Sequence, residues 1–157
     1  MKKITILLFL LLVTSCQKDE NLIINSIDLN IVKETDWQMA DEILVLINDY
    51  RNSLGLTNII VDKQYASAYA VDHTKYMIEN KELNHDNFNT RSEALKERGA
   101  KSVGENVAFG YKTAEAVVSA WITSGVHRDI IEGNFTHAGF GIILSPDGLY
   151  YTNIFYN

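Results

Sequence analysis

The segment from Gly104 to Gly141 constrains this chain most, because it combines polar groups with patterns of regular structure. It begins with the carboxylate of Glu105 in GENVAFG, continues through apolar residues at helical spacing, and reaches His127 before a strand bracketed by glycines. A second polar cluster, LNHDNFNTR, lies upstream and contains His85. We expect the fold to bring His85, Glu105 and His127 together in one cleft.

The rest of the chain alternates between helical and extended patterns. The last two expected strands are separated by the turn sequence SPDG, which joins neighbouring antiparallel strands. This order predicts an α+β fold with helices packed on an antiparallel sheet. Expected helices span residues 37–54, 63–80, 91–98 and 113–123, with one further turn at 127–131, and expected extended segments span 57–61, 138–144 and 149–155.

Helix starts are marked by residues whose side chains accept hydrogen bonds from free amides of the first turn. We expect Thr35 or Asp36 to cap the first helix and Asp62 to cap the second. The sequence from Thr90 to Glu93 matches a capping box, which predicts the start of the third helix.

The N-terminus is typical of an exported lipoprotein. Lys2 and Lys3 precede an apolar run, Ile4 to Val13, that is too short to span a bilayer of about 30 Å but fits a signal peptide. The small residues before Cys16, the only cysteine, resemble a bacterial lipobox, in which the thiol receives a diacylglycerol. An ordinary signal peptide is the alternative. We therefore divide the chain into a leader (1–15), a lipidated cysteine and tether (16–35) and one folded domain (36–157).

The charge balance excludes one class of partner. A formal charge of −6 argues against nucleic acid, since binding phosphates needs clustered Lys and Arg. The leader and Cys16 instead predict attachment to a membrane through acyl chains, in the cell envelope at the outer membrane or cell surface.

His85, Glu105 and His127 have the chemistry of metal ligands. Two imidazoles and one carboxylate form a common catalytic zinc site, with water as the fourth ligand. No spacing such as H-E-x-x-H occurs, so the ligands would come from separate elements. A polar network that only holds helices and sheet together remains an alternative. The remaining histidines, His73 and His137, are expected in packing, surface or structural roles.

Several motifs then occur in an order that resembles the CAP superfamily (cysteine-rich secretory, antigen 5 and pathogenesis-related 1 proteins; the SCP domain), in its bacterial, cysteine-poor branch. The motifs are ILVLINDYRNSLGL, YMIENKELNH, GENVA, AVVSAWITSGVHRDII, FTHAGFGI and YYTNIF. The resemblance implies a three-layer α-β-α sandwich around a central antiparallel sheet.

Many members of that superfamily carry two His and two Glu in a cleft, and some bind a divalent metal there. The resemblance assigns His85, Glu105 and His127 to three of these positions. The second Glu is expected three residues after the helix Trp, where this chain has Ser124. Serine is a poor zinc ligand, so the implied cleft is His85, Glu105, Ser124 and His127, with His85 and His127 as candidate metal ligands.

Three functions fit these observations. The first is a surface-anchored module that binds a small molecule, lipid or protein in the His/Glu cleft, and we favour it. The second is a metal-dependent, peptidase-like hydrolase in which Glu105 is base or third ligand. The third is a scaffold whose polar cluster is only structural.

Overall fold

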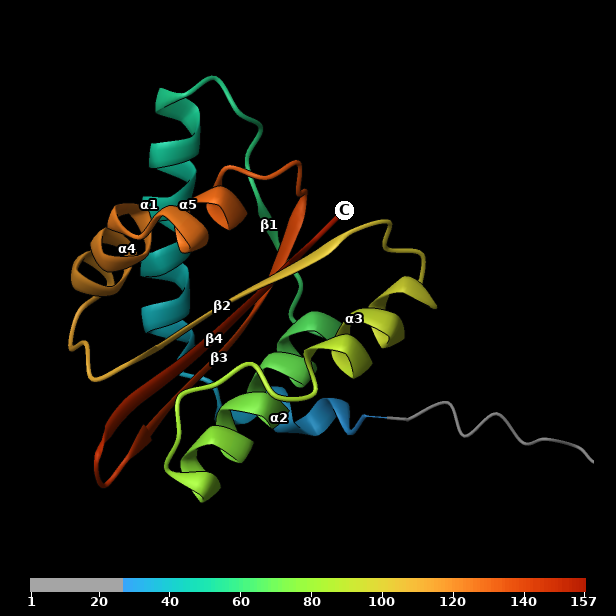
Figure 1. Cartoon of the computed structure of the whole chain (residues 1–157), viewed down its shortest axis with the longest axis vertical. Coiled ribbons are helices and arrows are strands. Elements are labelled where there is room, and N and C mark those ends of the chain that lie inside the picture. The colour runs from blue at the N-terminus through green and yellow to red at the C-terminus, as the bar shows by residue number, and fades with distance from the viewer. Residues whose placement is uncertain (1–26) are drawn as a thin grey trace, which may run out of the picture.

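A four-stranded sheet forms the middle layer of the structure, a computed structural model that describes residues 27–157. Its strands are β1 Ile60–Val61, β2 Val103–Phe109, β3 His137–Ser145 and β4 Gly148–Tyr156. They lie in the order β1-β3-β4-β2, so β2 is at an edge (Figure 1). β3 and β4 form the predicted antiparallel hairpin, β2 also pairs with β4 antiparallel, and β1 pairs with β3 in parallel. A parallel pair needs a long crossover, which the chain between β1 and β3 provides.

Helices cover both faces of this sheet. They are η1 Leu29–Glu34, α1 Trp37–Ser53, α2 Tyr65–Asn80, α3 Phe88–Lys96, α4 Ala114–Thr123 and α5 Gly125–Ile131. α1, α4 and α5 pack on one face around Trp121 and Phe140, and α2 and α3 pack on the other around Tyr69 and Ile154 (Figure 1). The predicted α+β fold, a three-layer α-β-α sandwich, is confirmed.

Acidic and hydroxyl side chains satisfy free amides at the helix starts. The Asp36 carboxylate accepts from the amide of Met39 at 3.1 Å, as predicted, and the Thr113 hydroxyl accepts from the amide of Ala116 at 3.2 Å. Asp62 acts from further away, because α2 begins only at Tyr65. Its two oxygens still accept from the amides of Gln64 (2.7 Å) and Ala66 (3.0 Å). The predicted N-cap at Asp62 is therefore wrong, since Gln64 holds that position, but the Asp62 carboxylate still satisfies amides at the start of α2.

The predicted capping box at residues 90–93 is wrong. α3 begins at Phe88, and its N-cap is Asn87, which has a left-handed backbone with φ of 58°. Asparagine tolerates this conformation better than most residues, so the helix can begin three residues before its expected start at Arg91. Thr90 and Arg91 therefore lie within the helix, and the Arg91 side chain is free to point at the sheet.

The segment containing Glu105 is a strand that the sequence did not reveal. Every residue from Gly104 to Ala108 is buried, because helices cover both faces of β2. A strand buried on both faces lacks the alternation of apolar and polar residues that predicts a half-exposed strand.

Packed structure begins before the predicted domain boundary at residue 36. η1 lies against α2, and the buried Thr35 hydroxyl donates to the carbonyl of Phe140 at 2.9 Å. The expected tether, residues 16–35, therefore includes a helical segment that belongs to the domain. The expected leader and Cys16 lie outside the described residues. Within residues 27–157, no helix has the length and apolar character needed to cross a bilayer.

A buried arginine fixes the position of α5, the helix that carries His127. Arg51 of α1 is 1% exposed and donates to the carbonyls of Ile131 (2.5 Å) and Gly133 (2.9 Å) at the end of α5. The carbonyl of Ile131, the last residue of α5, lies beyond the reach of the helix's own amides, so the guanidinium supplies its partner. The carbonyl of Gly133 also accepts from the amide of Phe135 at 2.8 Å.

α2 lies directly against β3 because two glycines remove the side chains between them. A Cβ on Gly139 would overlap the backbone of Ala66 and Ser67, and one on Gly141 would overlap the backbone of Ala70. These backbone atoms all belong to α2 and cannot move without displacing the whole helix. The contact with β3 therefore sets the position of α2 and of the loop that follows it.

We predict that Gly139→Ala lowers the free energy of unfolding by about 2–3 kcal/mol, because the added methyl group meets backbone atoms. The matched control is Gly125→Ala in α5, where the nearest atom is 4.0 Å away. That change should leave stability equal or up to about 1 kcal/mol higher. Urea denaturation of both variants measures the difference, and equal stability of the two would contradict the packing argument.

Candidate functional site

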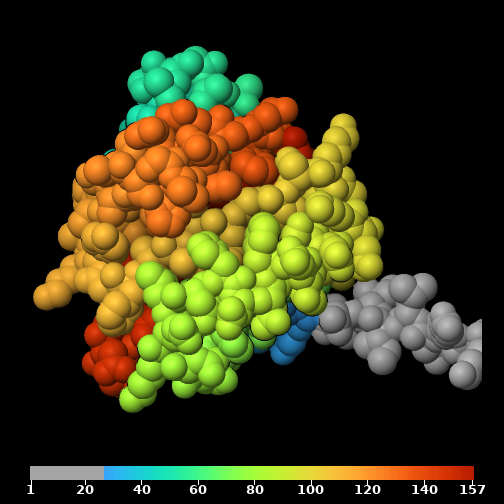
Figure 2. Space-filling view, in the orientation of Figure 1, coloured from blue at the N-terminus to red at the C-terminus, as the bar shows by residue number. Residues whose placement is uncertain are grey.

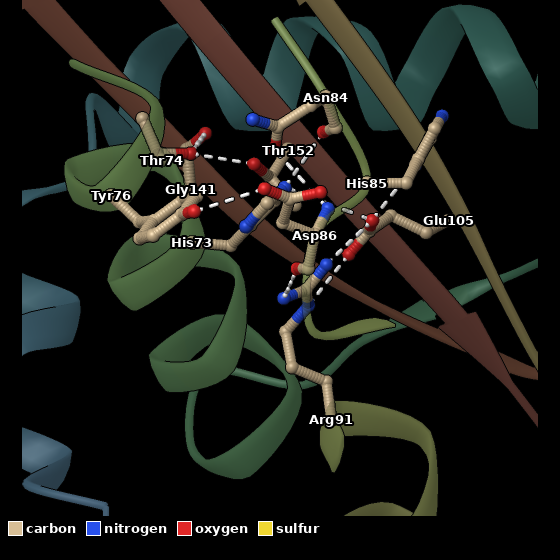
Figure 3. Close-up of polar contacts among 10 residues, drawn as sticks. All are labelled: His73, Thr74, Tyr76, Asn84, His85, Asp86, Arg91, Glu105, Gly141 and Thr152. Atoms are coloured by element: carbon tan, nitrogen blue, oxygen red, sulfur yellow. Dashed lines mark hydrogen bonds and ion pairs between the residues drawn. The ribbon is translucent and has the colours of Figure 1, made fainter. Parts of the chain in front are cut away.

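The carboxylate of Glu105 is the centre of a buried polar cluster, which Figure 3 shows together with α2 and the sheet. β2 carries it into the layer between sheet and α3, where its side chain is 1% exposed. Arg91 of α3 donates to both oxygens, from Nε to Oε2 and from Nη2 to Oε1, each at 2.8 Å. A buried charge needs such a partner, and a bidentate pair is the strongest arrangement.

His85 connects this cluster to solvent. Its Nδ1 lies 2.9 Å from Glu105 Oε1, and its side chain is 50% exposed. An ionised carboxylate can only accept, so Nδ1 carries the proton in this contact. In a neutral ring the other nitrogen, Nε2, is then an acceptor, which leaves it able to bind a donor.

His73 of α2 contacts the loop that carries His85, and the sequence predicted a packing or surface role for it. It is buried, and its Nε2 is 2.9 Å from the carbonyl of Asn84 and 3.9 Å from Glu105. Because a carbonyl only accepts, Nε2 donates and holds the loop that carries His85. Burial lowers the pKa of His73, the nearby Arg91 charge adds to this effect, and the ring is therefore neutral at pH 7.

The pKa of Glu105 is lowered although the group is buried. Burial by itself raises this pKa, but hydrogen bonds from His85 and Arg91, together with the positive charge of Arg91, outweigh it. Glu105 is therefore ionised at neutral pH and is a weaker base than an ordinary carboxylate.

His127 and Ser124 lie at the start of α5, on the other side of β2. Both line a hollow of about 250 Å³, whose remaining wall is mostly apolar: Leu83, Val107, Ala108, Phe109, Tyr111, Ala120 and Trp121. In Figure 2 the atoms of β2 are visible between the α4–α5 segment and the segment around residue 85. Asn106 fixes α5 here, since its Nδ2 donates to the carbonyl of His127 at 3.0 Å.

The predicted site residues are thus brought together in two groups. His85 and Glu105 are in direct contact, and Ser124 and His127 share the hollow. Leu83, two residues before His85, lines the same hollow, so the loop that carries His85 borders it. Burial lowers the pKa of His127, and the charge of His85 lowers it further. We call the hollow together with His85 the cleft.

A second hollow of about 510 Å³ lies between η1, α2 and α3, and the buried His73 and Arg91 contribute to its wall. It is larger, but Arg91 already donates to Glu105 and to the carbonyl of Asp86, and His73 Nε2 is already bonded to the carbonyl of Asn84. We therefore treat the cleft, where His85 and His127 are accessible, as the candidate site.

The side chains in the cleft do not fit a zinc centre with three protein ligands. Glu105, the expected third ligand, accepts hydrogen bonds from Arg91 at both oxygens and from His85 at one. Within residues 27–157, no three His, Cys, Asp or Glu side chains are grouped to hold a metal ion. Glu105 orients His85 instead of serving as a ligand.

Arg91 is the site residue that sequence reasoning missed. Arg91 lies six residues after His85, but its place between Thr90 and Glu93 assigned it to a capping box. Only the true start of α3 turns this side chain towards β2.

We predict that Arg91→Met lowers the free energy of unfolding by about 3–5 kcal/mol, because it leaves the Glu105 charge buried without its main partner. Glu105→Gln should also destabilise, since it leaves the guanidinium unpaired. The double variant should be more stable than the sum of the two single effects predicts, which a double-mutant cycle in urea measures. Additive effects would show that the pair does not act as a unit.

We also predict that the contribution of Glu105 to the stability of the fold decreases as the pH falls. A carboxyl whose pKa is lowered in the folded state stabilises fully above its unfolded value, near 4.5, and loses this effect as pH falls through the folded pKa. The stability difference between the wild type and Glu105→Gln should therefore shrink as pH falls from 5 to 3. A constant difference across this range would contradict the lowered pKa.

The architecture matches solved bacterial structures. An outer surface protein from Borrelia burgdorferi has a TM-score of 0.69 at 18% identity, covering 76% of this chain and 92% of that one. An extracellular protein containing an SCP domain from Bacillus anthracis has a TM-score of 0.61 at 26% identity, covering 74% of this chain and 39% of that one. A cysteine-rich secretory protein from Staphylococcus aureus has a TM-score of 0.64 at 17% identity, covering 80% of this chain and 40% of that one.

Sequence relatives come from Bacillus subtilis. The protein YkwD is 52% identical over 46 residues, and the membrane protein YlbC is 31% identical over 128 residues, which are 29% and 78% of this chain. The matches span only 18% and 36% of the lengths of those relatives. A model of the cysteine-rich secretory protein family (CAP) matches residues 44–156, and the chain therefore belongs to this family.

Proposed function

We propose that this protein is a lipid-anchored, extracytoplasmic CAP-domain module that binds an amphipathic ligand in the cleft. The observation that carries the proposal is the bidentate Arg91–Glu105 pair. Because Arg91 holds both oxygens of Glu105, this carboxylate is engaged within the protein. The groups left for a ligand in the cleft are imidazoles, a hydroxyl and apolar surface, which are suited to binding.

The cleft wall indicates the kind of ligand. Leu83, Phe109 and Tyr111 are large apolar side chains that are between 36% and 48% exposed at this hollow. Ser124 and His127 supply hydrogen-bonding groups beside them. A volume of about 250 Å³ is below the usual range for a whole small-molecule site, about 300–1,000 Å³. The hollow therefore suits one aromatic or short acyl group of a larger ligand, with polar atoms next to it.

The hydrolase hypothesis has less support. It needs Glu105 as a general base or as a third metal ligand. A carboxylate with a lowered pKa, paired with arginine, is poorly suited to accept a proton, and both of its oxygens already accept hydrogen bonds from Arg91 or His85. The scaffold hypothesis accounts for the buried half of the cluster, but not for the exposed apolar wall beside His127.

We predict that apolar probes change the fluorescence of Trp121, which lines the hollow. A Trp37→Phe background leaves Trp121 as the single tryptophan, since the chain has two. Titration with fatty acids of six to twelve carbons and with N-acetyl amides of aromatic amino acids should give saturable changes. Ala120→Phe, which fills the hollow, should weaken binding at least tenfold.

The matched control is Ser119→Phe, on the same helix but facing a different hollow, which should bind as the background does. If no probe of either class produces a saturable change, or if both variants behave alike, the cleft is not the binding site.

The proposed anchor rests on the N-terminal sequence and on the relatives. The names of the matched proteins describe a membrane protein, an outer surface protein and an extracellular protein. A lipidated Cys16 behind an export signal would put this domain in the same kind of location, with the membrane as its partner.

We predict that Cys16→Ser moves the protein from the detergent phase to the aqueous phase in Triton X-114 partitioning and abolishes labelling with radioactive palmitate. The control is Cys16→Ser combined with Ser26→Cys, which keeps one thiol outside the lipobox and should behave like Cys16→Ser. Palmitate labelling that persists without Cys16 would contradict the assignment.

A further inference from the structure

The outer edge of β2 is the feature that the proposed cleft leaves unexplained. β2 pairs with β4 only, and among the described residues no other strand covers its second edge. In an antiparallel pair, the main-chain groups of alternate residues face the partner strand, and those of the residues between them face away.

Hydrogen bonds at both ends of the ladder show which residues face outward. The amide of Gly110 donates to Leu149 O at 2.8 Å, and the amide of Asn157 donates to Ser102 O at 3.3 Å. Even-numbered positions therefore face β4. The odd-numbered residues Val103, Glu105, Val107 and Phe109 present their N–H and C=O groups to the free edge. The bond from Trp121 Nε1 to Val107 O, at 3.1 Å, agrees with this assignment.

Most of these outward groups have no partner within residues 27–157. Trp121 satisfies the carbonyl of Val107, but the structure gives the amide of Val107 and both main-chain groups of Glu105 no hydrogen bond to another described residue. Glu105 is 7% exposed as a residue while its side chain is only 1% exposed, so its contact with solvent is mainly through the main chain. Unpaired edge groups of this kind are complementary to another extended chain.

Side chains of β2 connect its outer edge to both faces of the sheet. The side chain of Glu105 points to the α2 face and contacts His85, and the side chain of the next residue, Asn106, points to the opposite face and contacts α5 at His127. The two histidines therefore flank the edge from opposite faces of the sheet. Further along, Val107 and Phe109 of the same strand line the apolar hollow.

We infer that the ligand of the cleft is an extended peptide segment that pairs with the outer edge of β2 at residues 105–109 and places an apolar side chain in the hollow. This inference rests on the proposed function and names its ligand class. Main-chain hydrogen bonds to Glu105 and Val107 supply affinity that does not depend on sequence, and the hollow beside Trp121 supplies the preference for one side chain.

The test uses the full chain, purified in detergent, against a random heptapeptide library displayed on phage. The tightest selected peptide is then synthesised as a series with a single N-methyl group on each backbone nitrogen in turn. If the peptide adds a strand, N-methylation at alternate positions removes a donor that faces β2 and weakens binding about tenfold or more, while the positions between them change little. Ala120→Phe should also weaken binding, and Ser119→Phe should not.

Other outcomes overturn the inference in distinguishable ways. If the selected peptides bind without alternation in the N-methyl series, or if no peptide is selected although fatty acids bind at Trp121, the ligand is not an added strand and the proposed function stands. If neither peptides nor apolar probes bind, both the inference and the proposed function fail. Dimerisation of the chain that is abolished by Val107→Pro would show that a second copy occupies the edge, and this would also overturn the inference.

Discussion

The ion pair between Arg91 and Glu105 is the interaction on which the arrangement of the site depends. Each charge is buried, and each would be costly to bury alone. Because Arg91 also donates to the carbonyl of Asp86 at 2.6 Å, one guanidinium joins α3, the loop after α2 and the edge strand of the sheet. The loop that carries His85 therefore takes its position from a contact with β2 and from one with α3.

This pair also divides the polar cluster into two parts with different roles. Glu105, Arg91 and His73 are enclosed: Arg91 donates to Glu105, and His73 Nε2 donates to the main-chain carbonyl of Asn84. His85 contacts Glu105 with one nitrogen, and half of its side chain is exposed to solvent. The buried half holds the edge of β2 in place, and the accessible half is available to a ligand. Chemistry that needs a free carboxylate is not favoured by this division.

The parts of the fold that follow from local signals were predictable. α1, α4 and the β3–β4 hairpin carry caps, helical periodicity or turn residues within a few positions of their ends, and the structure reproduces their predicted bounds closely. β2 and the start of α3 were not predictable in this way. β2 is covered on both faces and so shows no alternation, and α3 starts at an asparagine in a left-handed conformation that a competing capping-box pattern obscured. The polar stretch before α1 was expected to be a tether, but η1 packs against α2, a long-range contact that no local pattern encodes.

The same distinction holds for the site. Residue types and motif order were sufficient to single out His85, Glu105, Ser124 and His127 and to indicate the family, because these depend on what the side chains are and on their order along the chain. Whether Glu105 acts as a base, a ligand or a support depends on which group meets it, and Arg91 reaches it only after α3 has packed on the sheet. The outward direction of the Glu105 main chain likewise arises from the pairing of β2 with β4. Such contacts join residues far apart in the chain, and only the folded arrangement of strands and helices decides them.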